Sequence, residues 1–501
     1  MKILRIRACR ISSARCFNQE MNKKEIIEII DKNSAEIVDI SHSIWEFAEL
    51  SLKETESAAL YVEKLKEHGF DVETGHAGIE TAFSGKYVSG SGKPVIGILG
   101  EFDAISGVSQ KAACTHHEEL VPGGSGHGCG HNMLGAASFG AAAAVKKYLE
   151  ETGADGTVIF FGCPGEEGGA SKAFMAREGM WKSLDCALTW HPGSENQVIT
   201  GTNNSCTQVL YKFSGIPAHA AGDPENGRSA LDAVELMNVG ANYLREHMKK
   251  ECSLHYAIVD GGGLSPNVVQ PHASVLYMVR SVLVRDTLEL QERVDKCAEG
   301  AALMTGTTFE RIFVDGTANA VPNTTLEKVL YSNMNAVPMP EYTEEELAFA
   351  AELDAACPPS YEVPGTGAQF DTRIREKVWE MSDHGKKYLN NFLMPFYSGN
   401  EFEPGSSDVG DVSWQTPAAQ FNTVCFTAHS PGHSWQNVSC GASTIGDKGM
   451  LYAAKVLACS AADLFENVSL IEDARAEHAA RLGGEEYMCP IPADAAPYVI
   501  E

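Results

Sequence analysis

The sequence lacks any long uninterrupted hydrophobic run. A helix that crosses a bilayer needs about 18 or more consecutive apolar residues, and no stretch of the 501 residues approaches that length. Basic residues are also few, because 39 Lys and Arg stand against 67 Asp and Glu and leave a formal net charge of −28. This balance argues against a protein that binds nucleic acid or lies on an anionic membrane.

The fourteen cysteines lack the regular spacing of a disulfide framework. Scattered cysteines are typical of proteins in a reducing compartment, so we expect a cytoplasmic location. Residues 1–20 are basic up to Glu20 but lack the continuous apolar core of a secretory signal. We interpret them as an upstream extension, or as the result of a wrongly assigned initiation site ahead of Met21. An organelle-targeting signal is the alternative.

Apolar runs that are typical of buried strands alternate with helical stretches in the first 200 residues. The runs 94–100, 157–162 and 186–190 have the composition of strands that are covered on both faces. Alternation of this kind predicts an α/β fold with a mainly parallel sheet flanked by helices.

The pattern changes near residue 204. Residues 204–320 have the order strand, helix, strand, strand, helix, strand, which is typical of an α+β, ferredoxin-like unit. We therefore predict an inserted domain, and we expect the first domain to resume after it because its sheet would otherwise end in an unpaired edge. The predicted parts are a catalytic domain at 21–203 and 321–475, the insertion at 204–320, and peripheral tails at 1–20 and 476–501.

Side chains that can carry chemistry stand where three of the predicted strands end. Glu101 and Asp103 follow the first strand, Glu166 and Glu167 follow the second, and His191 follows the third. Ligands bind outside the carboxyl ends of the strands in sheets of this class. We therefore expect these side chains to converge.

A glycine-rich turn carries Cys129 and His131 at the start of a helix of small residues. A thiolate and an imidazole on one tight turn suit a metal ion, although a plain glycine turn with a buried Cys129 would account for the same residues. A thiol-redox role for Cys129 has less support, because no second cysteine stands at C-x-x-C spacing.

Glu167, His191 and His433 add further donors to this pair. The combined set exceeds what one tetrahedral ion accepts when a water position stays open, so it suits two neighbouring divalent ions such as zinc or manganese, with an activated water between them. Glu166 would remain free to act as general base and acid. The alternative is that Glu166 and Glu167 are simply solvated side chains of a surface loop.

Seven motifs between about residues 26 and 465 resemble those of the M20 metallopeptidases, in the amidohydrolase branch that includes the aminobenzoyl-glutamate hydrolases. They are G-C-G-H at 128–131, P-G-E-E-G-G at 164–169, W-H-P at 190–192, A-H-A at 218–220, G-G-G…P-N-V-V at 261–269, S-S-D-V-G-D-V-S-W at 406–414 and P-G-H-S-W at 431–435. The resemblance implies that Cys129 bridges two metal ions and that Glu166 is the general base and acid. The remaining ligands it implies are His131, Glu167, His191 and His433.

The resemblance also implies that the inserted domain dimerises and reaches over the neighbouring copy's site. His219, Asn267 and Arg280 match the substrate-binding positions. His219 would stabilise an oxyanion, and Arg280 would grip a substrate carboxylate. A capped strand turn for His219 and Asn267, and a solvated strand arginine for Arg280, are the structural alternatives.

One motif departs from the wider family, in which His-x-Asp often stands where this chain has Glu101-Phe102-Asp103. We expect Asp103 to orient a metal-bound imidazole. We expect Asp408 and Asp411 to hold a glycine-bounded turn that leads into a strand at 405–414.

The expected activity is metal-dependent hydrolysis of an amide bond in an N-acyl or aminoacyl amino acid with a free carboxylate, similar to aminobenzoyl-glutamate. A dipeptidase that acts on unusual dipeptides would use the same residues. A non-catalytic binding subunit is the alternative from another class. The expected partners are a small amide substrate, a second copy of the chain and a partner subunit.

Overall fold

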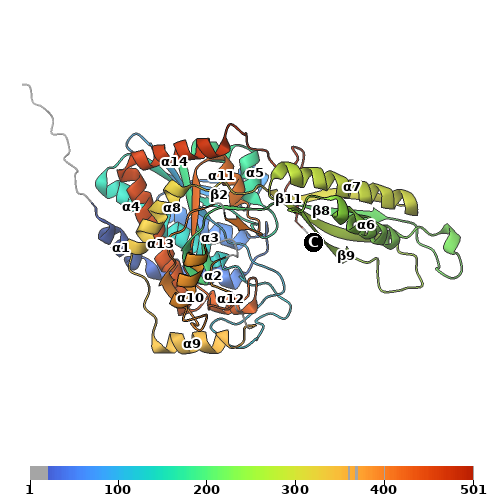
Figure 1. Cartoon of the computed structure of the whole chain (residues 1–501), viewed down its shortest axis with the longest axis horizontal. Coiled ribbons are helices and arrows are strands. Elements are labelled where there is room, and N and C mark those ends of the chain that lie inside the picture. Colours follow the sequence, from blue (N-terminus) through green and yellow to red (C-terminus); the bar gives the residue numbers. More distant parts are fainter. Residues whose placement is uncertain (1–20, 359–361, 367–370, 400, 500–501) are drawn as a thin grey trace, which may run out of the picture.

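The protein is described by a computed structural model at residues 21–358, 362–366, 371–399 and 401–499. Two lobes lie side by side, and each is built on its own sheet (Figure 1). The predicted extension at residues 1–20 lies outside the described residues. No helix in the described part is long and apolar enough to cross a bilayer.

The first lobe is built around an eight-stranded sheet with the order β1-β2-β4-β3-β5-β14-β6-β12. The strands are β1 (Asp71–Thr74), β2 (Phe83–Ser89), β3 (Val95–Gly100), β4 (Gly156–Gly162), β5 (Cys186–Gly193), β6 (Glu195–Val198), β12 (Asn390–Leu393) and β14 (Ala418–Val424). The central strands β4, β3, β5 and β14 pair in parallel, which confirms the predicted α/β class. Because β14 lies beside β5, the first sheet does continue after the second lobe.

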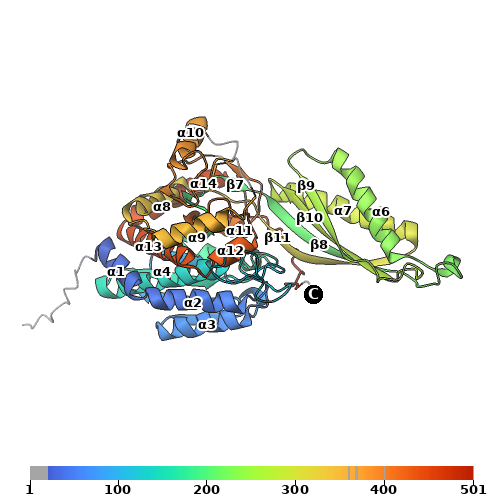
Figure 2. The same cartoon turned by 90° about the horizontal axis from the view of Figure 1, so that it is seen from below.

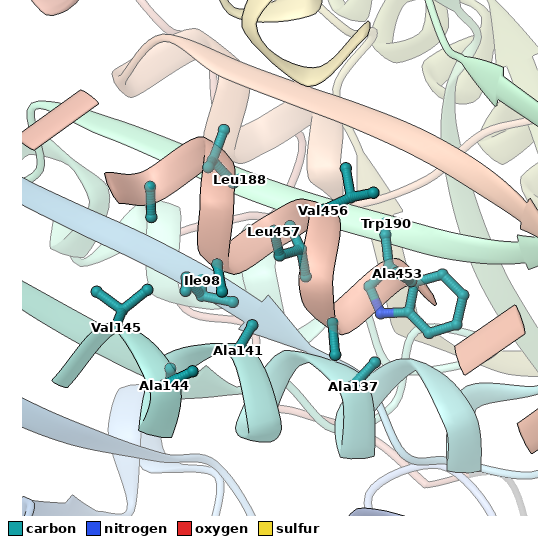
Figure 3. Close-up of a cluster of buried hydrophobic side chains, with 14 of the residues drawn as sticks. Ile98, Ala137, Ala141, Ala144, Val145, Leu188, Trp190, Ala453, Val456 and Leu457 are labelled. Atoms are coloured by element: carbon teal, nitrogen blue, oxygen red, sulfur yellow. The ribbon is translucent and has the colours of Figure 1, made fainter. Parts of the chain in front are cut away.

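Two long helices cover one face of this sheet, α4 (His131–Thr152) and α13 (Thr444–Glu466). Figure 3 shows side chains of β3 and β5 meeting those of the two helices. The cluster includes Ile98, Leu188 and Trp190 from the strands, Ala137, Ala141 and Ala144 from α4, and Ala453, Val456 and Leu457 from α13, all of them buried. The alanines of α4 let the two helices approach closely.

Side chains of the opposite parity on β3 and β5, such as Leu99 and Ala187, point to the other face and belong to a second buried cluster. Ala173 of α5 (Ser171–Arg177) and Val412 of α11 (Val409–Gln415) belong to the same cluster. Helices therefore cover both faces, as the apolar strands predict.

The second lobe contains β8 (Ser205–Ser214), α6 (Ala230–Leu244), β9 (Ser253–Asp260), β10 (His272–Ser281), α7 (Val284–Thr305) and β11 (Thr308–Thr317). Its sheet has the order β11-β8-β10-β9 and is antiparallel throughout. This is the predicted ferredoxin-like order of elements. Helices α6 and α7 pack against each other and on this sheet (Figure 2).

The other elements are α1 (Lys23–Lys32), α2 (Ser34–Phe47), α3 (Thr55–Glu67), α8 (Thr324–Ala336), α9 (Glu344–Asp354), α10 (Thr372–Met381), α12 (Trp435–Cys440), α14 (Val468–Leu482) and the short paired strands β7 (Thr202–Asn203) and β13 (Phe402–Glu403). The segment after α14 also packs on the lobes. Tyr487 donates a hydrogen bond to Asp411 at 2.6 Å, Arg177 donates one to the carbonyl of Pro492 at 3.0 Å, and Ile491 is buried.

The prediction of a strand at 405–414 is wrong, because residues 409–415 form the helix α11. The side chains of Asp408 and Asp411 were expected to hold the turn in which they stand, but they bind other segments. Asp408 accepts a hydrogen bond from the backbone amide of Lys172, and Asp411 accepts one from that of Ala318, both at 2.9 Å. These contacts with distant segments outweigh the strand-like alternation of the sequence.

Candidate metal centre

The five predicted ligands and Glu166 come together beside the carboxyl ends of β3, β4 and β5. Three overlapping groups have ligand atoms that all lie within 4.8 Å of one another: Cys129, His131 and His191; Cys129, Glu167 and His433; and Glu101, His131 and Glu166. The sulfur of Cys129 is 3.3 Å from Nε2 of His191. Because Cys129 belongs to two groups, it occupies the position of a shared donor.

The glycines of the turn allow this approach. Gly130 has φ of +83°, and a Cβ there would lie 3.0 Å from Cβ of Pro192, at the end of β5. A Cβ on Gly128 would lie 3.3 Å from the backbone of His433, and the carbonyl of Gly128 accepts a hydrogen bond from Asn437 at 2.9 Å. A side chain at either position would push the turn away from its neighbours.

Hydrogen bonds orient both imidazoles of the first group. Nδ1 of His191 donates to the carbonyl of Pro192 at 2.7 Å, which leaves the lone pair of Nε2 facing Cys129. Nδ1 of His131 is 2.8 Å from Oδ1 of Asp103, the contact expected from the sequence. The other oxygen of Asp103 accepts hydrogen bonds from the amide of Glu167 at 2.9 Å and the hydroxyl of Ser51 at 2.7 Å.

Two buried polar atoms of the cluster have no hydrogen-bond partner, namely Nε2 of His131 and Oε1 of Glu167. Buried polar atoms are normally paired. Oε1 of Glu167 also lies 3.5 Å from Nε2 of His433. A cation would satisfy both unpaired atoms, so the residues present fit a metal centre with sulfur, nitrogen and oxygen donors.

The electrostatics of the cluster favour a positive ion. Burial raises the pKa of the Cys129 thiol. Burial, together with Glu101 and Glu167, raises the pKa of Glu166 well above its ordinary value. Burial also lowers the pKa of His191 to about 4, which keeps its imidazole neutral. The neutral imidazole of His191 can therefore bind a cation directly, and the acids Cys129 and Glu166 stay protonated until a cation stabilises their charged forms.

A buried lysine that sequence analysis missed lies beside this cluster. The ammonium of Lys172 is 2.8 Å from Oε1 of Glu101 and 2.5 Å from Oδ1 of Asp408, and all three side chains are almost entirely inaccessible. The other oxygen of Glu101 is 3.3 Å from Nε2 of His131. Lys172 stands in an otherwise small and apolar helix start, S-K-A-F, and no local pattern marks it as a partner of Glu101.

The three predicted substrate-binding residues do not lie together in one chain. In the antiparallel pairing of β8 and β10, Arg280 stands opposite Cys206, at the end of the sheet next to the first lobe, and its guanidinium is 3.4 Å from the carbonyl of Pro404. His219 and Asn267 lie beyond the far end of β8, joined by a hydrogen bond between Ala220 and Asn267. Strands rise about 3.3 Å per residue, so roughly 25 Å separates the two ends.

Two further histidines near the cluster in sequence have structural partners. Nε2 of His127 is 2.9 Å from the carbonyl of Ile44, and the ring is buried. Nδ1 of His429 is 2.8 Å from Asp354. Neither belongs to the groups of candidate metal ligands in the described residues.

The chain belongs to the peptidase family M20/M25/M40, whose model matches residues 98–442. It is a hydrolase of that family. It is similar to one of the subunits of the p-aminobenzoyl-glutamate hydrolase of Escherichia coli, with 42% identity over 94% of this chain and 98% of that protein. It is also 27% identical to the Xaa-Arg dipeptidase of Mus musculus, over 61% of this chain and 69% of the dipeptidase.

Solved structures share the fold. An aminobenzoyl-glutamate utilization protein from Klebsiella pneumoniae superposes with a TM-score of 0.59 at 15% identity, over 88% of this chain and 98% of that one. A dinuclear metal binding peptidase of the M20 family from Bacillus subtilis superposes with a TM-score of 0.51 at 16% identity, over 87% and 99% of the two chains.

Proposed function

We propose that this protein hydrolyses the amide bond of p-aminobenzoyl-glutamate or of a similar N-acyl amino acid with a free carboxylate. The observation that carries the proposal is the convergence of Cys129, His131, Glu167, His191 and His433, with Glu166 beside them. Two of these ligands, His131 and Glu167, each keep a buried polar atom without a hydrogen-bond partner. The 42% identity to one component of a p-aminobenzoyl-glutamate hydrolase, over nearly its whole length, supports the substrate class.

Two divalent ions, zinc or manganese, would be held by these five residues, and Cys129 would be the donor shared by the two groups of ligands. When bound, such ions lower the pKa of water and polarise a carbonyl oxygen. The mixed donor set of the cluster is compatible with either metal.

Glu166 is the residue that moves protons in this proposal. Its carboxylate takes the proton of the attacking water and delivers it to the nitrogen of the leaving amine, so that the C–N bond breaks as the acid and amine products form. Asp103 keeps Nδ1 of His131 engaged, which leaves Nε2 as the nitrogen that would bind an ion. Lys172 holds Glu101 beside His131 and Glu166, where it would neighbour a bound ion.

A homodimer through the second lobe would complete the substrate site. His219 and Asn267 lie at the end of that lobe far from their own cluster, so we propose that they act on the partner's substrate, at the oxyanion, whereas Arg280 grips a carboxylate. A separate partner subunit is also part of the proposal, because two of the E. coli relatives are named as different subunits of the same hydrolase. We propose a cytoplasmic location, since the cysteines of the described residues are free thiols.

The test is a substrate comparison with purified, metal-loaded protein. We expect hydrolysis of p-aminobenzoyl-glutamate, and a large loss of rate with an analogue in which the α-carboxylate is replaced by an amide. Faster hydrolysis of Xaa-Arg or other dipeptides would favour the dipeptidase alternative, which the Mus musculus relative supports. No hydrolysis of either class by protein with full metal content would favour a non-catalytic binding role.

A further inference from the structure

A second group of metal-type side chains lies outside the candidate metal centre, on the loop between β3 and α4. The ligand atoms of Cys114, His116 and Glu118 lie within 4.8 Å of one another. The three residues alternate along the chain and present their side chains to one side. Nothing in the proposed reaction uses them.

We propose that Cys114, His116 and Glu118 bind one zinc ion, at a site distinct from the centre that contains Cys129. The distance from the sulfur of Cys114 to Nε2 of His116 is 3.7 Å, and that from Nε2 to Oε2 of Glu118 is 3.4 Å. Tetrahedral zinc with bonds of about 2.3 Å to sulfur and about 2.0 Å to nitrogen or oxygen separates such donors by about 3.3–3.6 Å. Two of the three distances between donors are therefore already close to the edges of a zinc tetrahedron, and the third is within 4.8 Å.

Hydrogen bonds already hold the backbone of this loop in place. The side chain of Gln110, which is buried, donates to the carbonyl of His116 and accepts from the amide of Glu118, both at 2.8 Å. The hydroxyl of Ser439 closes the other side, because it accepts from the amide of Cys114 at 2.8 Å and donates to its carbonyl at 2.7 Å. Binding would therefore require little ordering of the backbone.

The two carboxylate oxygens of Glu118 have different partners. Lys111 pairs with Oε1 of Glu118, and Oε2 is the oxygen that faces His116. The ring of His116 is largely exposed, which leaves room for water as a fourth ligand. A thiolate, an imidazole and one carboxylate oxygen favour zinc over magnesium or calcium, which prefer oxygen donors.

The proposed zinc site lies next to α12, the helix that follows the candidate ligand His433. Ser439, which holds Cys114, belongs to α12, and the neighbouring His117 packs on Trp435 at the start of that helix with 5.7 Å between the ring centroids. His433, a candidate ligand of the metal centre, stands two residues before Trp435. An ion on the loop would stiffen the support of His433.

The test follows alkylation of individual cysteines by iodoacetamide, with and without zinc, in the full chain. Zinc should slow the alkylation of Cys114 about tenfold or more, because a metal-bound thiolate is protected. The protection should persist in Cys129→Ser, in which the candidate metal centre is impaired. It should be lost in His116→Ala but retained in His117→Ala, the matched control on the same loop.

Cys357, another partly exposed cysteine, serves as the internal reference in each digest. Zinc titration of chelator-treated protein gives the second readout, and His116→Ala should bind one equivalent fewer than His117→Ala. Alkylation of Cys114 that is indifferent to zinc, or equal protection in the two histidine variants, would overturn the proposal.

Discussion

Oδ1 of Asp103 lies 2.8 Å from Nδ1 of His131, and this contact decides which ring nitrogen faces the candidate metal centre. Both side chains are fully buried. Burial acts to raise the pKa of Asp103, but the hydrogen bond and positive charge of His131, together with the bonds from the amide of Glu167 and the hydroxyl of Ser51, outweigh burial and lower that pKa to about 2, so the carboxylate stays charged. Asp103 also holds the amide of Glu167, and one side chain therefore positions two candidate ligands.

Replacing Asp103 should weaken metal binding without removing a ligand. We expect Asp103→Asn to lower zinc affinity about 10–100-fold, the usual effect of losing the partner of a metal-bound histidine. Competition with a chromophoric chelator measures the affinity. Asp354→Asn, which breaks the similar contact with His429, is the control and should leave affinity unchanged. Equal losses in both variants would contradict the assignment.

Adjacent glutamates should separate catalysis from metal binding. Glu166→Gln should lower kcat by about 10²–10⁴ because the general base is lost, while metal content stays at the parent level. Glu167→Gln should instead lower metal content, since a candidate ligand is lost. Elemental analysis and initial rates on the same preparations give both numbers. Glu166→Gln protein with parent activity would refute the proposed role.

The buried Lys172 should matter for stability. Lys172→Met leaves the carboxylates of Glu101 and Asp408 without their buried cation, and breaking a buried pair in this way costs about 3–5 kcal/mol. Lys296→Met, which breaks an exposed pair with Glu299 on α7, is the control and should change the stability little, because exposed ion pairs contribute little. Urea unfolding followed by circular dichroism measures both. Similar values for the two variants would show that the buried charges are not paired as described.

The distance between Arg280 and His219 leads to a complementation experiment. Glu166→Gln and His219→Ala should each be nearly inactive alone. A mixed dimer should contain one site of its two with both residues intact if His219 acts on the partner's substrate, so the isolated mixed dimer should have about half of the parent activity. Co-expression with two different affinity tags isolates the mixed species. Activity no higher than the sum of the two homodimers would place His219 in its own site.

Acid should remove the stabilisation that Glu477 gives to the start of α8. Glu477 accepts hydrogen bonds from the amides of Thr324 and Thr325 and pairs with Arg481. Burial acts to raise its pKa, but these partners outweigh burial and lower it to about 2. A group whose pKa is lowered on folding stabilises the fold above its unfolded value, about 4.3, and loses that contribution as the pH falls towards 2.

The thermal midpoint of Glu477→Gln should therefore lie below that of the parent at pH 7, and the difference should shrink between about pH 4.5 and 2. Differential scanning calorimetry across this range measures it. Glu310→Gln, on an exposed position of β11, is the control and should differ little from the parent at any pH. A constant difference across the range would contradict the proposed contacts.

Local pattern was sufficient for the elements that the candidate site depends on. The apolar runs that end in Glu101, Glu166 and His191 became parallel neighbours whose ends meet, and the order of elements after residue 204 became the predicted second sheet. Strand burial and chain order are properties of consecutive residues, so they can be recognised without coordinates.

Contacts between distant segments could not be predicted in the same way. The alternation of residues 405–414 is typical of a strand, but Asp408 and Asp411 bind backbone amides more than 90 positions away and the segment is helical. The burial of Lys172 between two carboxylates, and the separation of Arg280 from His219, likewise follow from how the segments meet.

The sequence by itself determined the fold class, the inserted unit and the set of side chains that converge, because spacing and polarity along the chain encode them. Only the tertiary structure decided which ring nitrogen of His131 is free, what neutralises Glu101 and which residues one chain cannot bring to a common substrate. These depend on orientation and distance between segments, which have no signature in the order of residues.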